Sequence, residues 1–129
     1  MIKMVISDLD GTLLHSNQKF SAKNIAALEY LQSQNICCVI ATGRSPFSAR
    51  KVLPPNFPID YLVFSSGAGV IHWPEQQIVL KRHFLVSEGQ KLIRFLRRHQ
   101  IDFMVHSPIP ENHRFFYHLA NGRPSPDFE

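Results

Sequence analysis

The chain has 129 residues, of which 44% are hydrophobic, 19% charged and 11% aromatic. Its length suits one compact domain, and its composition excludes a disordered tail, a collagen-like repeat and a small disulfide-rich scaffold. The 14 Lys and Arg residues exceed the 10 Asp and Glu residues, which gives a formal net charge of +4, too small for a nucleic-acid-binding arm. No apolar run reaches the roughly 18 residues that a membrane span needs.

The N-terminal apolar run is interrupted by Asp8 and Asp10, which is not typical of a signal peptide. The two cysteines, Cys37 and Cys38, are adjacent within an apolar run. Neighbouring residues of a strand point to opposite faces, so the two thiols are poor disulfide partners. We therefore expect two buried, reduced cysteines and a cytoplasmic protein.

The first half of the chain predicts alternating strands and helices. Residues 2–7 are short, apolar and rich in branched side chains, which indicates a strand buried on both faces, as in a parallel sheet. We expect a helix over 21–34 with Ser21 as its N-cap, a buried strand over 36–41, a short helix opened by Ser45 and Pro46, and a strand over 60–64. This order is typical of an α/β sheet with three parallel strands.

The second half of the chain is richer in strands and predicts a separate α+β unit. A hairpin is expected over 70–81, then a helix from Ser87 to about residue 99, then strands over 101–106 and 114–119. The aromatic residues of the last strand (Phe115, Phe116 and Tyr117) are expected to pack on the helix. The segment 121–126 is rich in turn residues.

Candidate chemistry lies at the carboxyl end of the first strand, where open parallel sheets bind ligands. A carboxylate such as Asp8 can attack phosphorus, and a second one such as Asp10 can move the proton of the leaving group. Two close acids attract Mg²⁺, which offsets the repulsion between an anionic nucleophile and an anionic substrate. Gly11 permits a sharp turn, and Thr42 adds a hydroxyl at the end of the second strand.

The alternative interpretation of Asp8-Leu9-Asp10-Gly11-Thr12 is a polar turn after a strand. Four fixed residues recur by chance about once per 10⁵ positions at average composition. A second strand that ends in Thr-Gly-Arg adds to the pattern, so we favour the functional interpretation.

The segment from Asp8 to Leu14 resembles the first motif of the haloacid dehalogenase (HAD) superfamily. Ala41-Thr42-Gly43-Arg44 resembles its second motif, in the form of the Cof-type phosphatases with an α/β (type IIB) cap. The resemblance implies a Rossmannoid core over residues 1–83, followed by the beginning of an α+β cap over 84–129. Thirty-four residues separate Asp8 from Thr42, which leaves no room for a cap between the two motifs.

The resemblance also implies roles for individual residues. Asp8 would be the nucleophile and Asp10 the general acid and base, with Mg²⁺ held by the Asp8 carboxylate and the Asp10 carbonyl. The phosphate-binding residues would be Leu9, Thr42 and Gly43, and the residues on the substrate side would be Arg44 and Ser66.

The sequence departs from the family pattern in two places. Ser66 stands where Cof-type proteins usually carry Asn, and its side chain has a shorter reach. The third motif, a Lys, and the fourth, an acidic Gly-Asp cluster, are both absent. We therefore expect the chain to be the N-terminal portion of a longer phosphatase. Its uncovered first strand would favour self-association.

Other charged residues have simpler interpretations. Arg44 is equally compatible with a surface position at the start of a helix. The run Arg94, Arg97 and Arg98 is interpreted as a solvated face and not as a nucleic-acid site. The seven histidines show no metal-ligand spacing, so we expect structural or surface roles for them.

Together these features predict a Mg²⁺-dependent phosphatase that acts on small phosphorylated metabolites through an aspartyl-phosphate. We expect no nucleic-acid partner and no membrane association. The alternative is a catalytically inactive module that binds a phosphorylated ligand or another protein.

Overall fold

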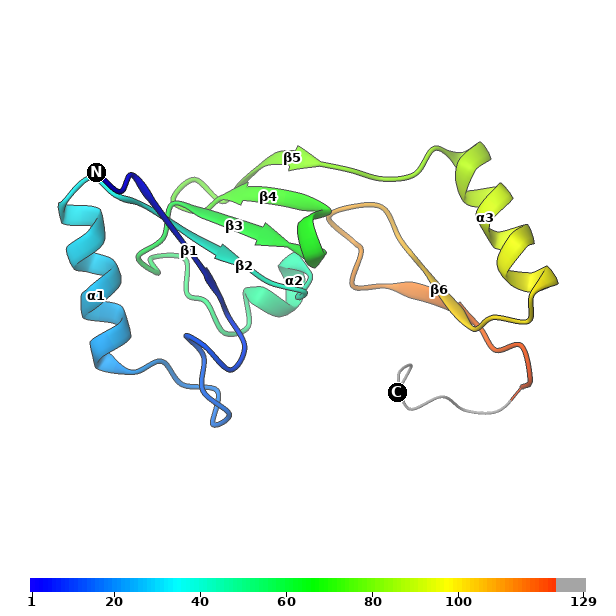
Figure 1. The fold of residues 1–129 in the computed structure, drawn as a ribbon, viewed down its shortest axis with the longest axis horizontal. Helices are drawn as coiled ribbons and strands as arrows, with labels where there is room; N and C mark the ends of the chain where they lie inside the picture. Colours follow the sequence, from blue (N-terminus) through cyan, green and yellow to red (C-terminus); the bar gives the residue numbers. More distant parts are fainter. Residues whose placement is uncertain (123–129) are drawn as a thin grey trace. The chain divides into compact units, whose positions relative to one another are not determined.

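The computed structural model describes residues 1–122 and separates into two units, Met1–Arg82 and a second unit that begins at His83 (Figure 1). The interpretation of these units as a catalytic core (1–83) and the start of a cap (84–129) stays a prediction. Most of the turn-rich segment 121–126 lies outside the described residues.

The first unit contains one five-stranded sheet in the order β1-β2-β3-β4-β5. The β1–β2 and β2–β3 pairs are parallel, and the β3–β4 and β4–β5 pairs are antiparallel. The predicted strand-helix-strand-helix-strand order is confirmed, and the predicted hairpin extends the same sheet. The elements are β1 (Met4–Asp8), α1 (Ala22–Ser33), β2 (Cys37–Ala41), α2 (Pro46–Ala49), β3 (Tyr61–Phe64), the 3-10 turn η1 (Ser65–Gly67), β4 (Gly69–His72) and β5 (Gln77–Lys81).

Both helices of this unit begin where the sequence predicts. The Ser21 hydroxyl accepts a hydrogen bond from the Asn24 N–H at 3.0 Å. The Ser45 hydroxyl accepts one from the Ser48 N–H at 3.3 Å, and Pro46 occupies the first turn of α2. These hydroxyls satisfy N–H groups that have no partner inside the helix, which fixes the two crossover helices between the parallel strands.

One face of the sheet forms the core of the first unit. The Cys38 sulfur lies 3.9 Å from the Leu28 carbonyl oxygen, so α1 covers this face. The Trp73 indole N–H donates to the Pro54 carbonyl at 3.2 Å, which satisfies the polar atom of a fully buried ring. The other fully buried strand side chains on this face are Ile40, Leu62, Phe64 and Ile71. Cys37 and Cys38 are both free thiols, as expected. Only Cys38 is buried, so the prediction that both cysteines are buried is wrong for Cys37, which lies on the opposite face of β2 and is partly exposed.

The opposite face is largely open around β1. Met4 and Ile6, which alternate with the inward residues of β1, are 52% and 62% exposed. The prediction that the first strand is buried on both faces is therefore wrong, because no element among residues 1–122 packs on Met4 and Ile6. β1 lies at the edge of the sheet and pairs only with β2 in this described part, as the sequence predicts.

The second unit contains α3 (Val86–Arg98) and a two-stranded antiparallel sheet of β6 (Phe103–His106) and β7 (Phe115–His118). The predicted N-cap, Ser87, is wrong. The cap residue is Leu85. Its N–H donates to the Glu88 carboxylate at 3.0 Å, so the side chain of Glu88 in the first turn provides the acceptor for this N–H group. The predicted packing on the helix is not found for Phe116, the middle aromatic residue of β7, which is 80% exposed.

Candidate active site

The parallel pairing of β1 and β2 brings the two sequence motifs to the same edge of the sheet. Asp8, the last residue of β1, lies opposite Ala41, the last residue of β2, and Thr42 follows directly. Asp8 is exposed, whereas Thr42 is only 5% exposed. The Thr42 N–H donates to the Val63 carbonyl at 2.9 Å, which ties this edge to β3. A carboxylate and a hydroxyl group therefore share one edge.

The loop after β1 is a tight turn anchored by Leu9. Its side chain is fully buried, and its carbonyl accepts from the Leu14 N–H at 2.8 Å. Gly11 has a φ of +76°, the left-handed region that glycine adopts without a steric cost, as the predicted sharp turn requires. The Gly11 N–H donates to the Leu14 carbonyl at 2.9 Å. This donor is therefore engaged within the loop.

Arg44 binds Asp10 through two of its nitrogens. Its Nε lies 3.1 Å from Oδ1 and 2.9 Å from Oδ2 of Asp10, and its Nη2 lies 2.7 Å from Oδ1. The Ser48 carbonyl and the Gln18 side-chain oxygen each accept a further hydrogen bond from the guanidinium at 3.4 Å. Arg44 is thus held against Asp10 while it stands directly before the N-cap of α2, so its role toward a substrate stays a prediction.

This ion pair sets the protonation of Asp10. The hydrogen bonds from Arg44 hold the pKa of the Asp10 carboxyl below its ordinary value. Partial burial opposes this effect, and the positive charge of Arg44 adds to it. Asp10 is therefore a carboxylate at neutral pH, the form that accepts a proton.

Ser66 is brought next to the second motif by the turn η1 after β3. Its N–H donates to the Thr42 carbonyl at 3.1 Å. Its hydroxyl oxygen lies 3.7 Å from the position that a β-carbon on Gly43 would occupy. The φ of Ser66 is 53°, in the left-handed region where Asn is more common than Ser. The hydroxyl of Ser66 thus lies within the candidate site.

The structure brings together every residue that the sequence singled out, with Leu9 as the buried anchor of the first loop. Sequence reasoning missed Gln18 and Ser48, which hold the Arg44 guanidinium. Ser48 lies one helical turn after Arg44, a spacing that offers a signal for this contact. Nothing in the sequence pattern marks Gln18.

The donors for a metal ion are few in this part of the chain. Residues 1–122 contain no group of three or more His, Cys, Asp or Glu side chains that could hold a metal. The Asp8 carboxylate and the Asp10 carbonyl remain as two oxygen donors on one short segment. This small set suits Mg²⁺, which commonly binds one or two protein carboxylates and keeps several waters. None of the helices described is long and apolar enough to cross a membrane.

Residues 5–123 match the protein family described as haloacid dehalogenase-like hydrolase. The chain belongs to this family. A sugar phosphatase of HAD subclass IIB shares the fold, with a TM-score of 0.59 at 20% identity over 89% of this chain and 43% of that one.

Two curated relatives from Bacillus subtilis (strain 168) are phosphatases. The chain is 38% identical over 77 residues to the phosphatase YwpJ, a match that covers 60% of this chain and 27% of that protein. It is 26% identical over 103 residues to 5-amino-6-(5-phospho-D-ribitylamino)uracil phosphatase YcsE, covering 79% of this chain and 41% of that protein. The chain thus spans less than half the length of these relatives.

Solved structures share the fold. The HAD-superfamily phosphatase BT1666 from Bacteroides thetaiotaomicron superposes with a TM-score of 0.74 at 26% identity, covering 98% of this chain and 43% of that one. A haloacid dehalogenase-like hydrolase from B. subtilis superposes with a TM-score of 0.65 at 27% identity, covering 81% of this chain and 36% of that one.

Proposed function

We propose that this chain carries the nucleophile and phosphate-binding edge of a phosphatase that works through an aspartyl-phosphate on Asp8. The observation that carries the proposal is the register of β1 and β2, which places Asp8 beside Ala41 and next to Thr42. Membership of a hydrolase family and similarity to named phosphatases support it.

The proposed reaction has two steps. An Asp8 oxygen attacks phosphorus, the bond from phosphorus to the leaving oxygen breaks, and that oxygen takes a proton from Asp10. A water then attacks the aspartyl-phosphate while Asp10 accepts its proton, and the bond between phosphorus and Asp8 breaks to release phosphate. The Thr42 hydroxyl and the backbone N–H groups of Leu9 and Gly43 would donate to the phosphoryl oxygens.

The Arg44–Asp10 pair favours the second step over the first. In the second step Asp10 acts as a base, and a pKa below its ordinary value keeps it unprotonated. In the first step Asp10 must carry a proton, so its contact with Arg44 must loosen when substrate binds. Arg44 would then be free to meet the anionic substrate together with Ser66.

Phosphatases of this family in general use Mg²⁺. The Asp8 carboxylate and the Asp10 carbonyl would hold the ion here. When bound, it would neutralise charge between the nucleophile and the phosphoryl group.

We propose small phosphorylated metabolites as substrates, in a cytoplasmic protein without nucleic-acid or membrane partners. Because the chain lacks the third and fourth motifs, we propose that a further segment supplies them in the active protein. Without it, the exposed Met4 and Ile6 on the edge strand β1 favour self-association.

One observation favours the alternative of an inactive binding module. Three guanidinium–carboxylate distances of 2.7 to 3.1 Å hold Asp10 against Arg44. Such a contact is compatible with a site that binds phosphate without turning it over.

Hydrolysis of p-nitrophenyl phosphate by the protein that joins this chain to the segment with the third and fourth motifs, with and without Mg²⁺, tests the two functions. The phosphatase predicts Mg²⁺-dependent turnover that is lost in Asp8→Asn and retained in Glu29→Gln, a change at an exposed carboxylate on α1. If the protein binds tungstate but does not hydrolyse p-nitrophenyl phosphate, the result supports the inactive binding module. Absence of both turnover and tungstate binding contradicts both functions.

A further inference from the structure

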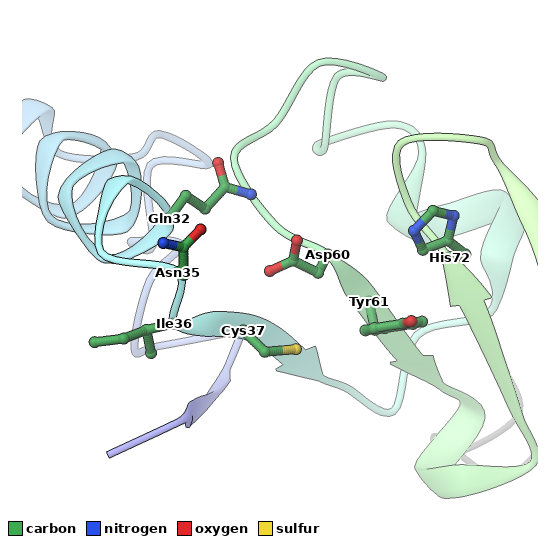
Figure 2. A pocket seen from close by; sticks show the side chains of 7 residues that line it. All are labelled: Gln32, Asn35, Ile36, Cys37, Asp60, Tyr61 and His72. Carbon is green, nitrogen blue, oxygen red and sulfur yellow. The ribbon is translucent and has the colours of Figure 1, made fainter. Parts of the chain in front are cut away.

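A second candidate site lies at the opposite end of the strands (Figure 2). It is an open pocket of about 340 Å³. Cys37 begins β2 and Tyr61 begins β3, whereas Thr42 follows the end of β2. At 3.3 Å per residue, β2 separates the pocket from the phosphate edge by roughly 13 Å. The pocket is lined by Gln32, Asn35, Ile36, Cys37, Asp60, Tyr61 and His72.

Asp60 is the fixed charge of this pocket. Its Oδ2 accepts from the Cys38 N–H at 2.7 Å, and its own N–H donates to the Cys38 carbonyl at 2.8 Å. These bonds hold the carboxylate against β2. Its other oxygen accepts no hydrogen bond from residues 1–122, and Figure 2 shows the carboxylate facing the end of α1. An acceptor with a defined position is therefore left for a ligand.

Two side-chain amides lie across from Asp60. Gln32 belongs to the last turn of α1, and Asn35 follows the helix with a φ of 56°. Neither side-chain amide makes a hydrogen bond to another residue in the described range. Each amide offers one acceptor and two donors, so this wall can pair with a ligand edge that carries both kinds of group.

A pair of aromatic rings forms the remaining wall. Tyr61 and His72 lie opposite each other on β3 and β4, with ring centroids 5.2 Å apart. The His72 Nδ1 lies 3.2 Å from the Glu75 carboxylate, which fixes the imidazole. The two rings are inclined to each other by 53°, so a planar ligand can stack on the face of one of them, Tyr61, with the edge of the other beside it.

The lining excludes two other classes of ligand. It contains no Lys or Arg, and its fixed charge is negative, so a phosphate is disfavoured. Burial raises the pKa of the Cys37 thiol, and the charge of Asp60 raises it further, so the thiol stays protonated and binds metals poorly. No metal-binding trio of side chains is present in the range 1–122.

We propose that this pocket binds a planar nitrogen heterocycle with an exocyclic amino group. The amino group donates to the free oxygen of Asp60, the ring edge pairs with the amides of Gln32 and Asn35, and the ring face stacks on Tyr61 beside His72. Such a ligand is bound apart from the phosphate edge and is not the substrate of the same turnover.

Cytosine and uracil test this proposal, because uracil has a carbonyl oxygen where cytosine has the amino group. Binding to the 129-residue chain is measured by ligand-observed NMR. We expect cytosine to bind at least about tenfold more tightly than uracil, since uracil would set an acceptor against the Asp60 carboxylate. Equal binding of the two bases, or no binding of cytosine, would overturn the proposal.

Two variants locate the ligand. Asp60→Asn should weaken cytosine binding about tenfold, whereas Asp102→Asn, the same change in the second unit, should leave it unchanged. Tyr61→Leu keeps the bulk and removes the ring, and it should also weaken binding. Circular dichroism checks the fold, and if Asp60→Asn unfolds, Tyr61→Leu decides. Full cytosine affinity in a folded Asp60→Asn or Tyr61→Leu variant contradicts the assignment of this pocket.

Discussion

Arg44 and Asp10 are 34 residues apart in the sequence, and their side chains meet in a two-nitrogen ion pair, with Nη2 of Arg44 2.7 Å from Oδ1 of Asp10. Asp10 retains 48% of its side-chain exposure, and Arg44 retains 22%. The pair therefore lies at the rim of the site, where an incoming anion can compete for the guanidinium. Arg44 in the second motif thus lowers the pKa of Asp10, the residue proposed to transfer protons.

The first prediction concerns the pKa of Asp10. Arg44→Gln removes the hydrogen bonds and the charge that lower it, so the pKa of Asp10 should rise toward its ordinary value. A carboxyl-carbon NMR titration measures this without any need for activity. Arg50→Gln is the matched control, because Arg50 is exposed and binds Gln76 outside the site. An Asp10 pKa that is the same in Arg44→Gln and wild type would contradict the structure.

The second prediction concerns stability against pH. A carboxyl whose pKa is lowered by folding stabilises the protein at pH values above its ordinary pKa, here 3.8. This stabilisation is lost as the pH falls through the lower pKa of the folded state. Because Asp10 is half exposed, its ion pair with Arg44 adds at most about 1 kcal/mol to the free energy of unfolding. The free energy of unfolding of wild type should exceed that of Arg44→Gln at pH 7, and the difference should shrink below pH 3.8. Urea titrations at pH 7 and below pH 3.8 measure this difference in the free energy of unfolding. A difference that grows in acid would contradict the ion pair.

Much of the first unit could be predicted from the sequence because its signals are local. The short apolar runs predicted β1, β2 and β3, and the hydroxyls of Ser21 and Ser45 marked two helix starts. Ser87 carried the same signal and was wrong, because the nearby Glu88 carboxylate caps the helix at Leu85 instead.

Features that depend on distant residues could not be predicted in this way. Met4, Val5 and Ile6 are consecutive apolar residues, so both faces of β1 are apolar. The pattern alone does not say whether another element covers each face. The motifs placed Asp10 and Arg44 at one edge of the sheet. Their direct contact required the geometry of two loops from different parts of the chain.

The third prediction concerns the turn at Gly11. Gly11→Ala places a β-carbon in open space, but at a φ of +76°, so backbone strain should destabilise the protein by about 1 kcal/mol. Gly89→Ala, in the helix α3 and also in open space, should stabilise it by up to about 1 kcal/mol. Urea denaturation followed by circular dichroism compares them. Equal effects of the two substitutions would contradict the left-handed turn.

The fourth prediction concerns Ser66. Asn adopts the left-handed region more readily than Ser, so Ser66→Asn should stabilise the protein by a few tenths of a kcal/mol. Its longer side chain should also reach further over Gly43 and tighten tungstate binding. Ser33→Asn, on the exposed end of α1, is the control. Tungstate binding in Ser66→Asn that equals that of wild type and Ser33→Asn would place residue 66 outside the phosphate site.

Phosphoryl transfer to Asp8 is the most direct test of the proposed chemistry. The protein that joins this chain to the segment with the third and fourth motifs is incubated with acetyl phosphate and Mg²⁺, quenched in acid and digested, and its peptides are analysed by mass spectrometry. We expect one added phosphoryl group on the peptide that contains Asp8, and none on that peptide in Asp8→Asn. A phosphoryl group on any other residue, or an unmodified Asp8 in protein that binds tungstate, would contradict the role of Asp8 as nucleophile.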